Sequence, residues 1–122
     1  VALLLAGCTT RPIVNVTDQP VVTSAGRQLS PDQVRNAIVK AGTALGWVMT
    51  PVSPGLVNGR LALRDHLAVV DVRYTATTYS ITYKDSTNLD FRDEEGKRTI
   101  HRNYVNWNNN LMNDARAELM RL

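Results

Sequence analysis

The sequence predicts a single α+β domain in which two helices pack on one face of a four-stranded antiparallel sheet. Apolar residues recur at three- and four-residue spacing in two stretches, one near residues 30–46 and one at the C-terminal end, as on the buried side of a helix. Between them, residues 47–84 contain short runs rich in β-branched and aromatic residues. The connections between these runs are too short for parallel crossovers, which favours a meander. The expected order over residues 30–122 is therefore α-β-β-β-β-α.

The first helix has clear signals at both ends. Ser30 is a favourable N-cap, Pro31 suits the first helical position, and Gln33 completes a capping box. Gly46 is placed to end the helix. The apolar side comprises Val34, Ala37, Ile38, Ala41 and Leu45. Gly42 costs about 1 kcal/mol relative to alanine, so we expect it to allow another element to approach closely.

Four strands are expected at residues 47–50, 56–64, 67–74 and 78–84. Asn58-Gly59 interrupts the second strand, where either a bulge or a tight turn would fit. Residues 85–99 are expected to form a polar loop or a small hairpin with Glu95-Gly96 at its tip. The second helix is expected to run from near Thr99 to the end. Its apolar stripe comprises Ile100, Tyr104, Trp107, Leu111, Ala115, Leu119 and Leu122.

The N-terminal apolar run ends in Leu5-Ala6-Gly7-Cys8, which resembles the lipobox of bacterial lipoproteins. The resemblance implies that residues 1–7 are a residual signal peptide that is removed and that Cys8 is acylated. In such proteins an aspartate after the cysteine favours the inner membrane, so Thr9 indicates the periplasmic face of the outer membrane. The alternative is that residues 1–7 form a buried strand or helix end, with Cys8 as a small core residue.

Residues 8–29 are expected to comprise the lipidated cysteine and a flexible tether, because prolines and turn-forming residues interrupt any periodicity. The alternative is that residues 13–16 add an edge strand to the body or to a partner. No later run approaches the ~18 apolar residues of a transmembrane helix, and the lone cysteine excludes an internal disulfide. The net charge of +3 includes no cluster of lysine and arginine, so no nucleic-acid partner is expected.

The second helix is unusually rich in asparagine, a poor residue for a helix interior. One stripe beside the apolar residues comprises Asn103, Asn106, Asn110 and Asn113, with Tyr104 and Trp107 at its border. This stripe is either a solvated flank or an uncharged hydrogen-bonding surface for a partner backbone or a glycan.

No catalytic, cofactor or metal site is expected from the sequence. His66 and His101 lack zinc-ligand spacing, and the acidic residues near Asp90 lack the glycine of a calcium loop. Ser86 and His101 could belong to a hydrolase acting on cell-wall or lipid substrates, but no Gly-x-Ser-x-Gly motif is present. A capped turn accounts for Ser86 better.

Residues 61–111 are similar to a group of small proteobacterial lipoproteins of unassigned function. The resemblance is carried by Leu63-Arg64-Asp65-His66, Ala68-Val69-Val70-Asp71-Val72, Tyr79-Ser80-Ile81-Thr82-Tyr83-Lys84-Asp85-Ser86-Thr87-Asn88-Leu89 and Ile100-His101-Arg102-Asn103-Tyr104. It implies an envelope location and transfers no catalytic residue. The expected function is that of a non-enzymatic binding or envelope-assembly module, anchored to the outer membrane through acyl chains on Cys8, with an envelope protein or a cell-wall glycan as partner.

Overall fold

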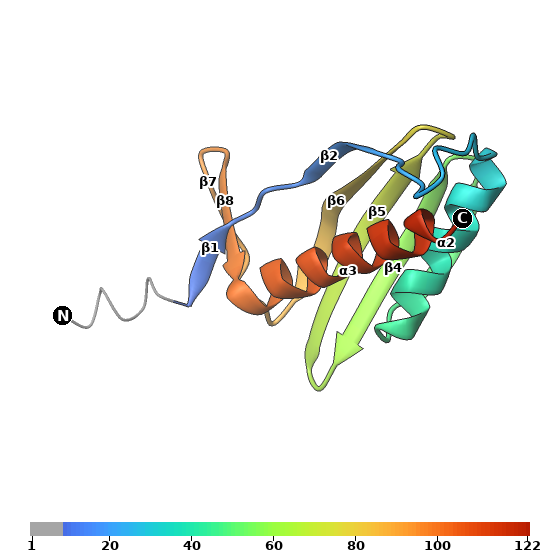
Figure 1. Cartoon of the computed structure of the whole chain (residues 1–122). Helices are drawn as coiled ribbons and strands as arrows, with labels where there is room; N and C mark the ends of the chain where they lie inside the picture. The colour runs from blue at the N-terminus through green and yellow to red at the C-terminus, as the bar shows by residue number, and fades with distance from the viewer. Residues whose placement is uncertain (1–8) are drawn as a thin grey trace.

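The computed structural model describes residues 9–122 and shows an α+β fold with two helices and two antiparallel sheets (Figure 1). The predicted signal peptide and Cys8 lie outside the described residues. The larger sheet has the strand order β2-β6-β5-β4-β3. Its strands are β2 (Val16–Pro20), β3 (Val48–Ser53), β4 (Leu56–Leu63), β5 (His66–Tyr74) and β6 (Thr78–Thr87). The smaller sheet has the order β1-β8-β7, from β1 (Thr10–Pro12), β7 (Arg92–Glu94) and β8 (Lys97–His101).

The predicted meander is confirmed for β3 to β6, but the prediction of a single four-stranded sheet is wrong. The segment expected to be a flexible tether contributes β2 to the larger sheet and β1 to the smaller one. Hydrogen bonds fix this segment in place: the Tyr83 backbone N donates to Asn15 Oδ1 (3.0 Å), and the Val21 N donates to the Thr77 carbonyl oxygen (2.8 Å). Segment 85–99 contains a hairpin, β7–β8, whose second strand pairs with β1.

The two helices are α2 (Pro31–Ala44) and α3 (Arg102–Met120). The predicted capping box of α2 is confirmed: Gln33 N donates to Ser30 Oγ (3.2 Å) and Ser30 N donates to Gln33 Oε1 (2.9 Å). Helix α3 begins later than predicted because Thr99 belongs to β8. Its N-cap is His101, whose Nδ1 accepts a hydrogen bond from Asn103 N (3.1 Å).

Both helices cover the same face of the larger sheet (Figure 1). One row of paired residues across this face runs Met49–Gly59–Val70–Tyr83. At one end of the row Met49 lies against α2, and at the other end the Tyr83 ring meets the Tyr104 ring of α3 edge-on, with centroids 5.6 Å apart. Side chains of paired residues project from the same face, so the helices share it.

Two glycines permit close packing on this face. A Cβ atom at Gly42 would lie 2.4 Å from Met49 Sδ, which confirms the expected close approach. Gly59 was expected to mark a bulge or a turn, and this expectation is wrong, because β4 continues through it in unbroken register with β5. A Cβ atom there would lie 3.1 Å from Val70 Cγ2. The glycine is therefore a packing residue.

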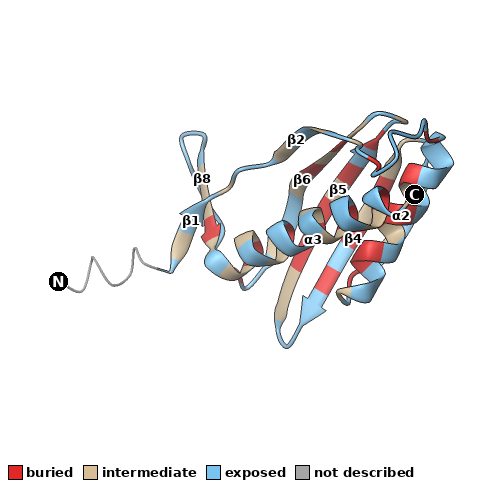
Figure 2. Cartoon of the chain, viewed as in Figure 1, coloured by how far each residue is buried: buried red, intermediate tan, exposed pale blue. Residues whose placement is uncertain are grey.

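The buried side chains form one core between the helices and the larger sheet (Figure 2). Most of the predicted apolar stripe of α3 is buried, including Leu111, Ala115 and Leu119. Trp107 is only half-buried, whereas Asn108 is 4% exposed. The helix is therefore rotated relative to the prediction, so that Asn108 is buried where the sequence predicts burial of Trp107.

Candidate binding groove

A groove lies between α3 and the segment at residues 12–19, which includes β2; we call it the β2–α3 groove. Its volume of ≈ 410 Å³ falls within the ~300–1,000 Å³ typical of small-molecule sites. On the α3 side it is lined by two rows at helical spacing, Tyr104, Asn108 and Met112 in one and Val105 and Asn109 in the other. The groove therefore follows the side of α3 that faces β2.

The lining side chains are uncharged. The apolar ones are Pro12, Val14, Val16, Val105 and Met112, and the polar ones are Asn15, Thr17, Gln19, Tyr104, Asn108 and Asn109. Tyr104 is the only phenol among them, and burial raises its pKa far above the usual range, so the group is neutral. Val14 is 78% exposed, which places an apolar surface at the rim.

Two lining side chains carry buried polar atoms without a partner. The Tyr104 hydroxyl and Asn108 Oδ1 make no hydrogen bond to any described residue, although the two residues are only 2% and 4% exposed. A buried polar group left unsatisfied costs about 1–3 kcal/mol. Folding therefore leaves these two atoms unsatisfied in residues that line the groove.

Two further buried side-chain atoms of the described residues lack a hydrogen-bond partner, and neither belongs to a groove-lining residue. The Tyr79 hydroxyl is buried on β6, and Tyr79 pairs in register with the groove residue Gln19. Arg98 Nε is also buried without a partner, and the Arg98 guanidinium carbon lies 4.9 Å from the centroid of the Tyr83 ring. Of these four atoms, only those of Tyr104 and Asn108 belong to residues that line the groove.

An aromatic cluster fixes one end of the groove. Tyr83 stacks on Phe91 with centroids 4.8 Å apart and touches Tyr104 edge-on. Arg98 covers both Tyr83 and Phe91, at 4.9 Å and 5.8 Å from their centroids. Such cation–π contacts hold a guanidinium without a carboxylate. The cluster joins β6, β8 and α3, and so holds Tyr104 rigidly at the groove.

The predicted asparagine stripe does not line this groove. Asn106, Asn110 and Asn113 are exposed and Asn103 is half-buried, and none of the four faces β2 across the groove. Of the two border residues, Tyr104 lines the groove and Trp107 does not. The asparagines that do line it are Asn15, Asn108 and Asn109, of which the first lies in the segment predicted to be a tether.

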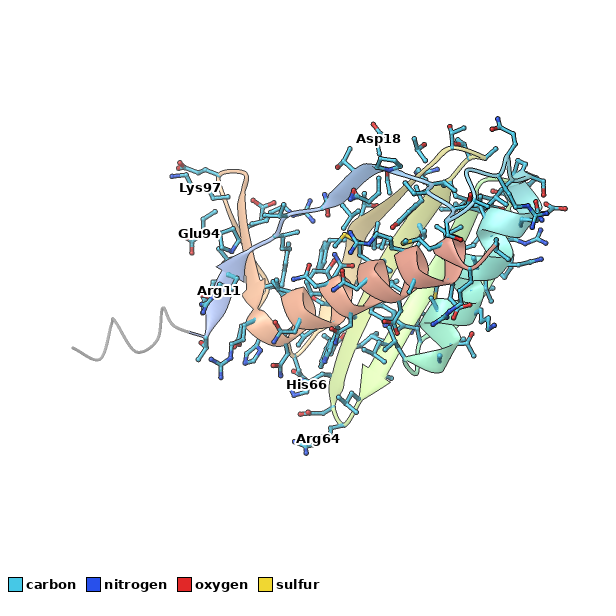
Figure 3. All side chains as sticks on the ribbon, viewed as in Figure 1. Arg11, Asp18, Arg64, His66, Glu94 and Lys97 are labelled. Atoms are coloured by element: carbon cyan, nitrogen blue, oxygen red, sulfur yellow. The ribbon has the colours of Figure 1, made fainter. Side chains whose placement is uncertain are left out.

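The residues of the alternative hydrolase are engaged in local contacts. Ser86 Oγ lies 2.7 Å from the Tyr83 hydroxyl, and Ser86 N donates to Asp85 Oδ1 (2.8 Å). His101 caps α3 through Nδ1, and no hydrogen bond in the described chain joins it to Ser86. His66 lies at the β4–β5 hairpin tip beside Arg64 (Figure 3), where its Nδ1 is 2.7 Å from the Asn88 carbonyl oxygen.

Within residues 9–122 no three histidine, cysteine, aspartate or glutamate side chains lie close enough together to hold a metal ion. Neither α2 nor α3 is both long enough and apolar enough to cross a membrane. Comparison with known proteins finds no matching family model, no similar curated protein and no similar solved structure.

Proposed function

We propose that this chain is a non-enzymatic binding module of the bacterial envelope, anchored at the periplasmic face of the outer membrane through acyl chains on Cys8. The observation that carries the binding role is the pair of buried, unpartnered atoms, the Tyr104 hydroxyl and Asn108 Oδ1, in an uncharged groove. A ligand that donates to Asn108 and hydrogen-bonds Tyr104 would remove the cost of burying them.

The chemistry of the groove supports binding rather than catalysis. General acid–base catalysis needs a group whose pKa lies near the operating pH. The only titratable side chain that lines the groove is Tyr104, and burial raises its pKa further from neutrality. Amide and hydroxyl groups, which fill the polar part of the lining, recognise ligands without changing their charge.

The anchor is supported by the lipobox-like residues 5–8 and by the resemblance of residues 61–111 to small lipoproteins. Because β1 begins at Thr10, the fold starts two residues after Cys8. A chain spans at most ~3.5 Å per residue, so acylation at Cys8 would hold the β1–β8–β7 sheet against the lipid headgroups rather than at the end of a long tether. Tethering also raises the local concentration of the module, so weak contacts would suffice.

Photo-crosslinking in the native cells tests the binding role. A benzoylphenylalanine placed at Val14, on the rim of the groove, should form a specific adduct with an envelope component. The same residue at Asn113, on the exposed side of α3, should not. The yield of the adduct at position 14 should also fall in the Asn108→Leu background. Equal adducts at both positions, or an adduct that ignores Asn108→Leu, would contradict a binding role for the groove.

Metabolic labelling with palmitate tests the anchor separately. The wild-type protein should incorporate the label and fractionate with the outer membrane, and Cys8→Ser should do neither. Recovery of an unlabelled protein that retains residues 1–7 would contradict the proposed membrane location. It would leave the description of the groove unchanged.

A further inference from the structure

We infer that the β2–α3 groove recognises a neutral glycan through an N-acetylated hexosamine unit; this inference rests on the proposed binding role. The pyranose hydroxyls would face the amide side chains, and the acetamido methyl would lie against the valine and methionine side chains. The acetamido N–H would donate to Asn108 Oδ1 once this buried amide turns toward the groove. Four features of the groove support this ligand class.

The first feature is charge. None of the described side chains that line the groove is charged, so it offers no oppositely charged partner for a carboxylate, a phosphate or an ammonium group. Burying an unpaired ion is far more costly than burying a neutral polar group. An occupant that fills the ≈ 410 Å³ groove must therefore be uncharged over the part that is buried.

The second feature is the combination of hydrogen-bonding groups. Asn108, Asn109 and Gln19 each carry an amide that both donates and accepts, as a sugar hydroxyl also does. The side chains of Thr17, Gln19 and Asn109 make no hydrogen bond within the described part of the chain, so their groups are available to a ligand. A ligand with many paired donors and acceptors fits such a lining.

The third feature is the apolar part of the lining, which a bare polyol would leave uncovered. Val16, Val105 and Met112 are half-buried beside Asn108, so an apolar group on the ligand would lie within reach of the amide. An acetamido group presents a methyl next to an N–H donor. It therefore satisfies the buried acceptor and covers the apolar surface at the same time.

The fourth feature is that the neighbouring sheet edge opposes strand addition by a peptide. β2 contains a bulge between Val16 and Gln19, in which Asp18 has a φ of 48° and its N donates to Ser80 Oγ (2.9 Å). Bulges and prolines are devices that prevent pairing at an edge, and β2 also ends at Pro20. A partner peptide would thus find a poor template beside the groove.

The test is an NMR titration of the full chain with N,N′-diacetylchitobiose, in which the signals of residues 9–122 are followed. We expect concentration-dependent shifts at the side-chain amides of Asn108 and Asn109 and at the methyls of Val105 and Met112. Asn108→Leu should weaken binding roughly three- to ten-fold, the range set by losing one net hydrogen bond. The matched control Asn110→Leu, on the exposed side of the same helix, should bind like the wild type.

Three results would overturn the inference. Equal binding of the de-acetylated, cationic disaccharide would show that the groove selects neither for a neutral ligand nor for the acetamido group. Shifts of the same residues with N-acetyl-leucine N-methylamide but not with the disaccharide would assign the groove to a peptide, and the proposed binding role would stand. No shift with either probe, together with a lower melting temperature for Asn108→Leu, would mean that ordinary water satisfies these atoms. That last result, with no crosslink from position 14, would also contradict the binding role.

Discussion

The two helices meet the sheet in different ways. Around Met49 the interface of α2 with β3 and β4 is closed: Gly42 and Gly59 bring Met49 against both backbones, and a Cβ atom added at Gly42 would overlap its side chain. A hollow of ≈ 300 Å³ lies at the start of α2, beside Pro31 and Val52. The side of α3 that faces β2 is open, with a groove of ≈ 410 Å³ and buried polar atoms that lack partners. Close packing without voids serves stability, so the contrast agrees with a structural role for α2 around Met49 and with the binding role proposed for the α3 groove.

The closed interface should show the largest effect of a truncation. Ile38→Ala removes a side chain that is 1% exposed and should lower the free energy of unfolding by about 3 kcal/mol through lost burial and a cavity. The matched truncation at the groove, Val105→Ala, should cost less than about 1 kcal/mol because Val105 is only half-buried. Urea denaturation measures both. Equal losses would mean that the two interfaces are packed alike.

The start of α2 should give the next largest effect. Ser30→Ala removes the side-chain acceptor of the capping box, which should cost about 1 kcal/mol of stability. Ser30→Gly serves as the control, because glycine at an N-cap costs only a few tenths of a kcal/mol. Thermal unfolding followed by circular dichroism distinguishes the two variants. An alanine variant as stable as the wild type would show that packing alone positions α2.

The capping box and the interfaces differ in how well the sequence predicts them. The start of α2 is encoded locally in Ser30, Pro31 and Gln33, and the structure confirms it. The strands β1 and β2 depend on pairing with β8 and β6, whose paired residues lie between 58 (Pro20 and Thr78) and 91 (Thr10 and His101) positions later in the chain. Their own sequences are short and carry Pro12 and Pro20, so local patterns predict a tether. Long-range pairing outweighs those local preferences.

The groove could be predicted only in part for the same reason. The asparagine content of α3 indicates a hydrogen-bonding surface, and the helical period places Tyr104 on the buried side. The rotation of α3 that buries Asn108 instead of Trp107 is set by packing against the sheet, which the sequence does not specify locally. The opposite side of the groove comes from residues 12–19, whose position depends on the pairing of β2 with β6.

Removing the Tyr104 hydroxyl, at the open interface, should change how the stability of the protein depends on pH. Burial raises the pKa of Tyr104 above its usual value of 10.0. The unfolded state therefore releases this proton at lower pH than the folded state does, and stability is present below pH 10 and falls as the pH rises above it. Tyr104→Phe should keep or slightly increase stability at pH 7.5 and should lose less of it at high pH.

Denaturation at pH 7.5 and at pH 11 measures this difference. The pKa values of Tyr79 and Tyr83 are raised as well, so the variant should retain part of the alkaline loss. A variant that is less stable than the wild type at pH 7.5 would mean that the hydroxyl has a stabilising partner, and the argument for an unsatisfied groove would fail.

A modest gain in stability is expected on the exposed side of α3, away from both interfaces. Asn106 and Asn110 are exposed, and their side chains make no hydrogen bond within the described chain. Because alanine favours a helix more than asparagine does, the double substitution Asn106→Ala/Asn110→Ala should raise stability by about 1 kcal/mol in total. If the groove is the binding surface, the crosslink from position 14 should persist in this variant. Its loss, with stability unchanged or higher, would transfer the binding role to the asparagine stripe of α3.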